Sequence, residues 1–398
     1  MSSSLSAHAR HQRTSLIVVF AIVFVDLVGF GIVIPVLPLY AERFGASPLT
    51  VGLLLSVYSA MQFIFAPILG KLSDRLGRRP ILLVSIIGTS LGFLLMGLAN
   101  TLGMLFAARI IDGITGGNIS TALAYIADIT PPEHRSKRMG LVGAAFGLGL
   151  IFGPAIGGLL SHVSLGAPFL FAAALAAGNA LAVYLVLPES LSATRRQEAH
   201  THASLGEVLR ESKGTSLPLV LTTYFFATAA FSLLTATYPL FTEHRFGLGA
   251  TQNGYIFACQ GIIGAVIQGG LLGWLVRYSG DKVLAIAGTA ILSVSLFVLP
   301  TSPTLMLLLL ATAGVAVGHG LVAAPLNGMA SNSVGSSAQG RVMGLMQSAG
   351  SLARIVGPVV GGWLLNHDAM YAAESFGRTP YWLAGIFMVV ACVLAANL

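Results

Sequence analysis

Three ionisable side chains of this sequence lie inside long apolar stretches, where no water is available to solvate a charge. Asp26 is ten residues into one such stretch, and Arg109 and Asp112 are three residues apart in another. A charged group at membrane depth costs at least about 2.5 kcal/mol on insertion scales, so it indicates a function. The spacing lets Arg109 and Asp112 pair on a helix, and a carboxyl group removed from water can be held in its neutral form. We expect the three residues to share one proton-binding network; a structural ion pair and a structural hydrogen bond are the alternatives.

Other polar residues within the apolar stretches could face a bound molecule. Arg354 has no acidic residue within a helical turn and could receive an anionic group or a carboxylate from the other half of the chain. His319 could titrate near physiological pH, or could be a structural side chain hydrogen-bonded to a carbonyl. The candidate substrate-binding residues are Asp26, Gln62, Arg109, Asn118, Gln268, His319 and Arg354.

The composition places these side chains in a membrane protein. Of 398 residues, 55% are hydrophobic and 9% are charged, with a mean hydropathy of +0.85, whereas a soluble domain carries about 25% charged residues. The net charge of +7 does not indicate nucleic-acid binding, because the cations lie in short segments between apolar runs. Since no metal-ligand cluster, nucleophile constellation or nucleotide-binding loop occurs in the sequence, we expect no enzyme, no cofactor and no metal.

Twelve stretches approach the roughly 20 residues that a helix needs to cross the hydrocarbon core. They are 16–39, 49–70, 81–99, 103–127, 139–161, 167–187, 218–241, 251–276, 283–300, 304–327, 341–365 and 380–398. We predict an all-α membrane protein with a six-helix bundle over 1–187, a cytoplasmic linker over 188–217 and a second six-helix bundle over 218–398.

The Lys and Arg residues in the loops predict the orientation. With the N-terminus inside, 16 of the 21 lie in inner segments, and only Arg43, Arg245 and Arg378 lie in outer loops. Because inner loops carry the excess of cations, we expect both termini in the cytoplasm and the protein in the cytoplasmic membrane.

The second half of the chain repeats the first. The segment 139–158 recurs as 343–362, at an offset of 204 residues, with Met-Gly-Leu followed by Gly-Pro-x-x-Gly-Gly in both copies. An offset by an even number of helices preserves their direction, so we expect parallel repeats related by an axis along the membrane normal. Arg354 breaks the repeat, because the first copy has Leu150 at that position.

The segment 70–80 carries a family resemblance. It reads Gly-Lys-Leu-Ser-Asp-Arg-Leu-Gly-Arg-Arg-Pro and matches the signature of the major facilitator superfamily, which the sequence resembles over essentially its whole length. The resemblance implies the twelve-helix major facilitator fold and a latch that holds the outward-facing state, with Asp74 pairing across the interface between the halves. The latch residues would be Gly70, Asp74, Arg75, Gly77, Arg78 and Arg79. Plain positive-inside charge is the alternative interpretation.

The fifth predicted helix contains a second motif. Its glycines, from Gly147 to Gly158, are similar to the pattern of antiporters in this superfamily, and small residues at such spacing let helices approach closely. The gating residues here would be Gly153, Pro154, Gly157 and Gly158. Helix packing alone is the alternative.

A narrower resemblance is to the tetracycline-efflux branch of the twelve-helix drug:proton antiporters. It is carried by the segments 26–38, 109–116, 125–128 and 187–190, and Gln62 and Gln268 match polar positions of the branch. Members of the branch carry an aspartate at the position of Gly92, a histidine at that of Gly264 and an aspartate near Leu292. These departures argue against metal–tetracycline as the substrate, but not against proton-driven efflux of an amphiphile.

The resemblance implies a monomeric multidrug or tetracycline-like antiporter of the inner membrane, which exchanges a small molecule for protons by alternating access. Two other classes stay open. An uptake symporter or facilitator for a small metabolite would suit Arg109 and Arg354 if the substrate is anionic. A membrane enzyme or receptor is disfavoured by the missing catalytic motifs and by the repeat.

Overall fold

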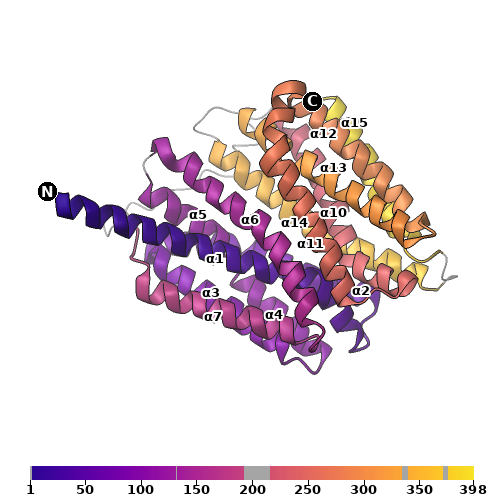
Figure 1. Cartoon of the computed structure of the whole chain (residues 1–398), viewed down its shortest axis with the longest axis horizontal. Coiled ribbons are helices and arrows are strands. Elements are labelled where there is room, and N and C mark those ends of the chain that lie inside the picture. Colours follow the sequence, from indigo (N-terminus) through magenta and orange to yellow (C-terminus); the bar gives the residue numbers. More distant parts are fainter. Residues whose placement is uncertain (1, 131, 192–215, 334–338, 371–374) are drawn as a thin grey trace.

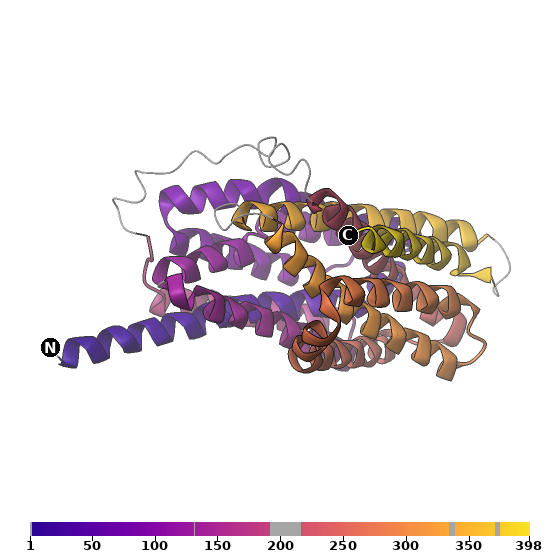
Figure 2. The same cartoon turned by 90° about the horizontal axis from the view of Figure 1, so that it is seen from above.

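The computed structural model describes residues 2–130, 132–191, 216–333, 339–370 and 375–398, and this part of the chain is helical without a strand. Figures 1 and 2 show the helices as two groups, one before and one after the predicted linker, most of which (192–215) lies outside the described residues. The first group is α1 (Ser2–Glu42), α2 (Pro48–Leu76), α3 (Arg78–Gly97), α4 (Leu102–Ile114), α5 (Asn118–Ile129), α6 (Pro132–Leu160) and α7 (Ala167–Val186). The second is α10 (Leu217–Phe246), α11 (Ala250–Val266), the π-helix η1 (Ile267–Leu271), α12 (Leu272–Val298), the 3-10 turn η2 (Leu299–Thr301), α13 (Leu305–Asn332), α14 (Gln339–Asp368) and α15 (Arg378–Ala396).

Local sequence signals set several helix ends. Ser47 accepts a hydrogen bond from the Thr50 amide at the start of α2, and Thr101 and Thr304 cap α4 and α13 in the same way. Such side chains satisfy amide donors that have no partner within the helix. Between α2 and α3 the turn is a single residue, Gly77, with φ of 109°, a conformation that suits glycine.

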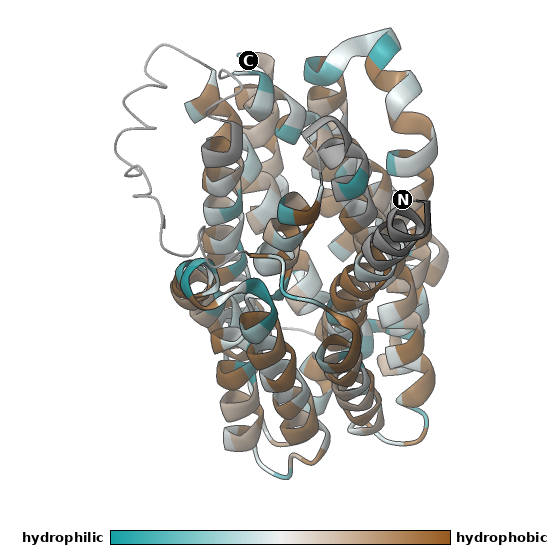
Figure 3. Ribbon diagram, turned by 90° about the vertical axis from the view of Figure 1, so that its left-hand side faces the viewer, coloured by the Kyte–Doolittle hydropathy of each residue, from teal (hydrophilic) through white to brown (hydrophobic). Residues whose placement is uncertain are grey.

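Within the described residues, ten helical segments are long and apolar enough to span a membrane, against the twelve stretches predicted. The predicted stretch 103–127 is interrupted, because α4 ends at Ile114 and α5 begins only at Asn118, which leaves two pieces that are each too short. Two other predicted stretches, 251–276 and 283–300, form one segment of 52 residues in which two helices join at Gly280, with φ of 78°. Along the spans Figure 3 shows mainly apolar residues.

The repeated glycine motif makes matching contacts in the two halves. Gly153 of α6 approaches the backbone of α1, and its counterpart Gly357 of α14 approaches the backbone of α10. Five residues further along, each helix meets the opposite half: Gly158 lies against α11 and Gly362 lies against α2. The helices α6 and α14 therefore each connect the first helix of their own half with a helix of the other half.

These contacts between the halves gather at one end of the molecule. We call the end that carries residues 71–79 the basic end and the opposite end, at the turns with Gly45 and Gly247, the far end. A Cβ on Gly254 would lie 2.6 Å from the Pro154 carbonyl oxygen, and Ser161 hydrogen-bonds to Thr251 at 3.0 Å, so the backbones touch near the far end.

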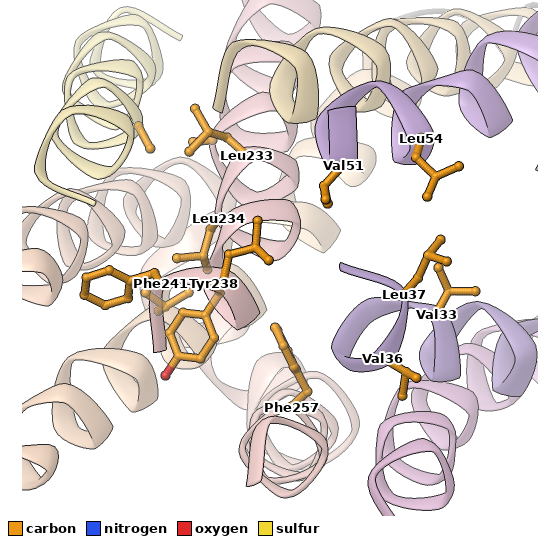
Figure 4. Packing of buried hydrophobic residues seen from close by; sticks show 14 of the residues in the cluster. Val33, Val36, Leu37, Val51, Leu54, Leu233, Leu234, Tyr238, Phe241 and Phe257 are labelled. Carbon is orange, nitrogen blue, oxygen red and sulfur yellow. The ribbon is translucent and has the colours of Figure 1, made fainter. Parts of the chain in front are cut away.

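The hydrophobic clusters show the same closure at the far end. One cluster contains residues of both halves, and Figure 4 shows Val33, Val51 and their neighbours from α1 and α2 facing Leu233, Tyr238 and Phe257 from α10 and α11. A second cluster consists only of first-half residues and includes Val18 and Leu187. The third consists only of second-half residues. A continuous core thus joins the halves on one side only.

Toward the basic end the halves separate. On α2, α6, α11 and α14, a Cβ added to Gly70, Gly147, Gly264 or Gly344 would meet nothing within 4 Å. In Figure 1 the end of α1 that bears the N-terminus and the end of α15 that bears the C-terminus point in different directions. The structure is therefore closed at the far end and open at the basic end.

Two glycines of α6 allow a matched test of this closure. A Cβ on Gly158 would lie 2.9 Å from the Thr251 carbonyl oxygen, whereas one on Gly147 would meet nothing. We expect Gly158→Ala to lower the thermal stability of the purified protein by several degrees, because overpacking costs about 1–3 kcal/mol. Gly147→Ala should leave the melting temperature unchanged or slightly raised. Equal melting temperatures for the two variants would contradict the closed far end.

Candidate functional site

A buried ion pair lies at the end of α4. Arg109 Nη1 is 3.1 Å from Asp112 Oδ2, one turn along the helix, and the residues are only 2% and 5% exposed. The Tyr58 ring of α2 covers the guanidinium, with Arg109 Cζ 4.2 Å from the ring centroid. Such a cation–π contact supplies the charge with a partner on the side away from Asp112.

Asp26 of α1 joins this pair through two neutral side chains. Asn118 Nδ2 donates a hydrogen bond of 2.8 Å to Asp26 Oδ1 and lies 3.4 Å from Thr89 Oγ1 of α3. Thr89 lines the same small cavity as Asp26 and Asp112. Asp26, Asn118, Thr89, Asp112 and Arg109, which we call the buried charge network, therefore lie together between α1, α5, α3 and α4.

The interruption between α4 and α5 positions Asn118. Because α5 starts at this residue, its side chain lies at a helix end rather than along a continuous helix. The interruption also leaves the Gly116 carbonyl free to accept a hydrogen bond of 3.0 Å from Gln62 Nε2, and the same nitrogen lies 3.2 Å from the Tyr58 hydroxyl. Irregular backbone at membrane depth is tolerated where protein groups satisfy it in this way.

A small cavity lies at the centre of the network. It is lined by Asp26, Phe30, Tyr58, Thr89, Phe93, Arg109 and Asp112, and its free volume is about 10 Å³, roughly the space of one water molecule. Arg109 Nε and Asn118 Oδ1 are buried, and neither has a hydrogen-bond partner in the described part of the chain. The network is thus closely packed but not fully satisfied by protein groups.

Gly92 explains how α4 can carry an acid here. A Cβ on Gly92 of α3 would lie 3.0 Å from Asp112 Cβ and 3.2 Å from the Ala108 carbonyl oxygen. The space that a side chain at position 92 would need is therefore occupied by Asp112. Side chains at positions 92 and 112 would therefore compete for the same space between α3 and α4.

Three of the predicted binding residues lie in the second half. Arg354 of α14 donates a hydrogen bond of 3.1 Å to Ser351 Oγ and is only partly exposed. His319 of α13 stacks on Phe231 with ring centroids 3.8 Å apart, and it makes no hydrogen bond with any described residue. Gln268 lies in η1, and its side chain is exposed. None of the three belongs to the buried charge network.

The predicted latch forms an ion cluster at the basic end. Arg78, the first residue of α3, pairs with Asp74 near the end of α2 at 2.6 Å and with Asp128 at the end of α5 at 3.0 Å. Asp128 also accepts a hydrogen bond from Ser190. These contacts all lie within the first half, whereas the sequence analysis expected Asp74 to pair across the halves.

Glu189 belongs to the same end of the molecule and was not among the predicted site residues. Its two carboxylate oxygens accept hydrogen bonds from the backbone amides of Arg78 and Arg79, at 2.9 and 3.2 Å. A carboxylate at a helix N-terminus satisfies free donors and interacts favourably with the helix dipole. The segment after α7 is thereby fixed to the start of α3.

Sequence reasoning also missed Tyr58 and Thr89. Tyr58 precedes Gln62 by one helical turn, so the polar character of Gln62 was a signal for this face of α2. Nothing in the sequence marks Thr89, because it becomes part of the network only through residues 29 and 23 positions away.

Comparison with known proteins shows the family of the chain. The family model described as Major Facilitator Superfamily matches residues 19–358 and 270–398. The chain is 36% identical over 397 residues to "Tetracycline resistance protein, class C" of Escherichia coli, with 96% of each chain covered. It is 31% identical to "Multidrug resistance protein 2" of Bacillus subtilis (strain 168), over 95% of this chain and 94% of that one. Among solved structures, the human organic anion transporter MFSD10 (TETRAN) superposes with a TM-score of 0.68 at 25% identity, over 96% of this chain and 99% of that one.

The buried ion pair can be tested by a double-mutant cycle. We expect Arg109→Gln and Asp112→Asn each to destabilise the protein by about 3 kcal/mol or more, because each leaves one charge buried without its partner. The double variant should be more stable than the sum of the single losses predicts. Thermal unfolding in detergent measures the stability of the unaltered protein, the two single variants and the double variant. Strictly additive losses would show that the two side chains do not interact.

Proposed function

Because the chain belongs to the Major Facilitator Superfamily, a family of transporters and not of enzymes, we propose that it exports amphiphilic drugs in exchange for protons. Its similarity to tetracycline-resistance and multidrug-resistance proteins supports drug efflux as the broad activity. Proton coupling and the residues responsible are our proposal. We place the coupling proton on the buried charge network, with Asp26, Arg109 and Asp112 as the charged members.

The observation that carries this proposal is the charge balance of the network. Asp26 and Asp112 line one small cavity together with Arg109, which is paired with Asp112 and is the one cation of the network. With both acids ionised the network carries one net negative charge, which is costly away from water. One bound proton neutralises it. The network is therefore suited to take up and release a single proton.

Alternating access follows from the way the halves meet. If the excess of cations places the basic end in the cytoplasm, the structure is inward-facing, because the far end is closed by the glycine contacts of α6 and α14. Both termini are then cytoplasmic. Opening the far end would require those contacts to part, and the Asp74 and Arg78 cluster would then be free to engage the other half as a latch.

The substrate of this proposal is an amphiphile rather than tetracycline in particular. Gln62, Asn118 and Tyr58 surround the network and can offer hydrogen bonds to a bound molecule. The positions at which tetracycline pumps carry further polar residues hold Gly92, Gly264 and Leu292 instead. Drug sites are mostly apolar surface with few polar groups, which this chain provides.

A second candidate is uptake of a small anion together with a proton. The observation that favours it is Arg354, a partly buried cation with no acidic partner in the described part of the chain. The similarity to the human organic anion transporter MFSD10 (TETRAN) points in the same direction. Import into cells driven by an inward proton gradient would favour this candidate over export.

Proton coupling is testable in inverted vesicles acidified inside. Addition of an exported substrate should release lumenal protons, and Asp26→Asn should abolish the release because an amide cannot bind the proton. A pH-sensitive dye in the lumen reports the signal.

Asp368→Asn is the matched control for this assay. Asp368 is a buried acid of α14 that accepts a hydrogen bond from the Thr379 amide, and an amide oxygen can replace that acceptor. We expect proton release by this variant to stay close to that of the unaltered protein. An unchanged response of Asp26→Asn would remove Asp26 from coupling.

The overlap of positions 92 and 112 yields a swap experiment. Asp112→Gly should lose substrate-induced proton release at least about tenfold, and Gly92→Asp should be poorly folded because its Cβ would lie 3.0 Å from Asp112 Cβ. The double variant Gly92→Asp with Asp112→Gly removes that Cβ and returns a carboxyl group to the contact between α3 and α4. We expect it to regain a measurable part of the release. A double variant no better than either single one, although it is folded, would show that the carboxyl group must come from α4.

A further inference from the structure

Arg354 lies where the contact between α2 and α14 ends and the open space begins. The next residue, Ile355, accepts a hydrogen bond of 2.7 Å from Ser56 of α2, and Gly52 of α2 packs against Pro358 one turn further toward the far end. In the opposite direction along α14, Gly344 meets nothing within 4 Å. The guanidinium is therefore at the innermost point of the space that opens toward the basic end.

Gly350 of α14 and Tyr224 of α10 lie beside the guanidinium. A Cβ added to Gly350 would lie 3.3 Å from Arg354 Nη1, 3.2 Å from Tyr224 Cε1 and 3.5 Å from the Tyr224 hydroxyl. Two of these distances are shorter than an ordinary contact, so a side chain at position 350 would displace Arg354 or Tyr224. Ser351 adds a hydroxyl that has already accepted a hydrogen bond from Arg354 Nη2, so its own proton remains available to donate.

The charge of Arg354 is not balanced by the described protein. No carboxylate of the described residues forms an ion pair with it. A partly buried guanidinium without an anion is costly, and its planar donors fit a carboxylate or a similar group in two-point contact. The Arg354 side chain, which is partly exposed, therefore has the charge and the donors to bind an anionic group.

We propose that Arg354, Ser351 and Tyr224 form the binding site for a negatively charged group of the transported amphiphile. This inference rests on the proposed function only in requiring that a substrate enters the space between the halves. The anionic group receives hydrogen bonds from the guanidinium and the two hydroxyls, and the apolar part of the substrate lies between the halves. Gly350 is required because a side chain there would displace Arg354 or Tyr224.

Equilibrium binding of two aromatic dyes to the purified full-length protein in detergent tests the site. The anion is carboxyfluorescein and the cation is ethidium, each followed by fluorescence anisotropy without any gradient. Arg354→Gln should weaken carboxyfluorescein binding about 10- to 100-fold, the usual loss for a hydrogen-bonded charge, and should change ethidium binding less than about twofold. Arg354→Lys should retain part of the affinity, because it keeps the charge but not the planar donors.

Gly350→Ala and Gly344→Ala on the same helix serve as a matched pair. The first would displace Arg354 or Tyr224 and should weaken carboxyfluorescein binding, whereas the second adds a methyl group in open space and should not. Melting temperatures of all variants establish that they are folded. Unchanged carboxyfluorescein binding in folded Arg354→Gln, an equal loss of both dyes, or binding of ethidium alone or of neither dye by the unaltered protein would overturn the proposal.

The outcome is separable from that of the proton-release assay. Carboxyfluorescein binding that depends on Arg354, without any proton release on substrate addition, would retain the anion site and reject antiport. Proton release that depends on Asp26, together with dye binding that does not depend on Arg354, would retain antiport and reject the anion site.

Discussion

The free-energy cost of burying a charge away from water is the main constraint on this structure. Arg109 can be buried because Asp112 lies one turn away and the Tyr58 ring covers its other side. Those two partners leave Asp26 to be held by a neutral side chain, and Asn118 reaches it only because the helix is interrupted after Ile114. The irregular backbone in the fourth predicted helix is thus a consequence of keeping two acids and one base together in hydrocarbon.

The two halves share the glycine contacts of the repeat but differ in their charged residues. Gly158 and Gly362 hold the halves together at the far end through matching contacts, so the scaffold is nearly symmetric there. The charged residues break that symmetry. The buried charge network belongs entirely to the first half, and Arg354 stands in the second half where the first copy has Leu150. Relative movement of the halves would therefore change the distance between the buried charge network and Arg354, which has no acidic partner among the described residues.

Much of this could be predicted from the sequence, because hydrocarbon thickness and the glycine repeat leave strong one-dimensional signals. Stretch lengths, the family and the pairing of Arg109 with Asp112 depend on spacing within one segment. What the sequence could not supply depends on contacts between distant segments. Asn118 meets Asp26 across 92 residues, and Gly92 meets Asp112 across two helices. The interruption after Ile114 was also missed, since an apolar run containing two glycines still looks like one continuous crossing.

Position 92 shows why a missing family residue need not mean a missing function. Tetracycline pumps of the branch that the sequence resembles carry an aspartate where this chain has Gly92, which from the sequence alone argues for a lost acid. In the structure Asp112 fills the space that a side chain at position 92 would need. The interaction energy of a charge depends on its distance from other charges and on the surrounding dielectric, and not on which helix carries it. A comparison made column by column along the sequence registers the missing aspartate at position 92, but not the acid that α4 places beside that position.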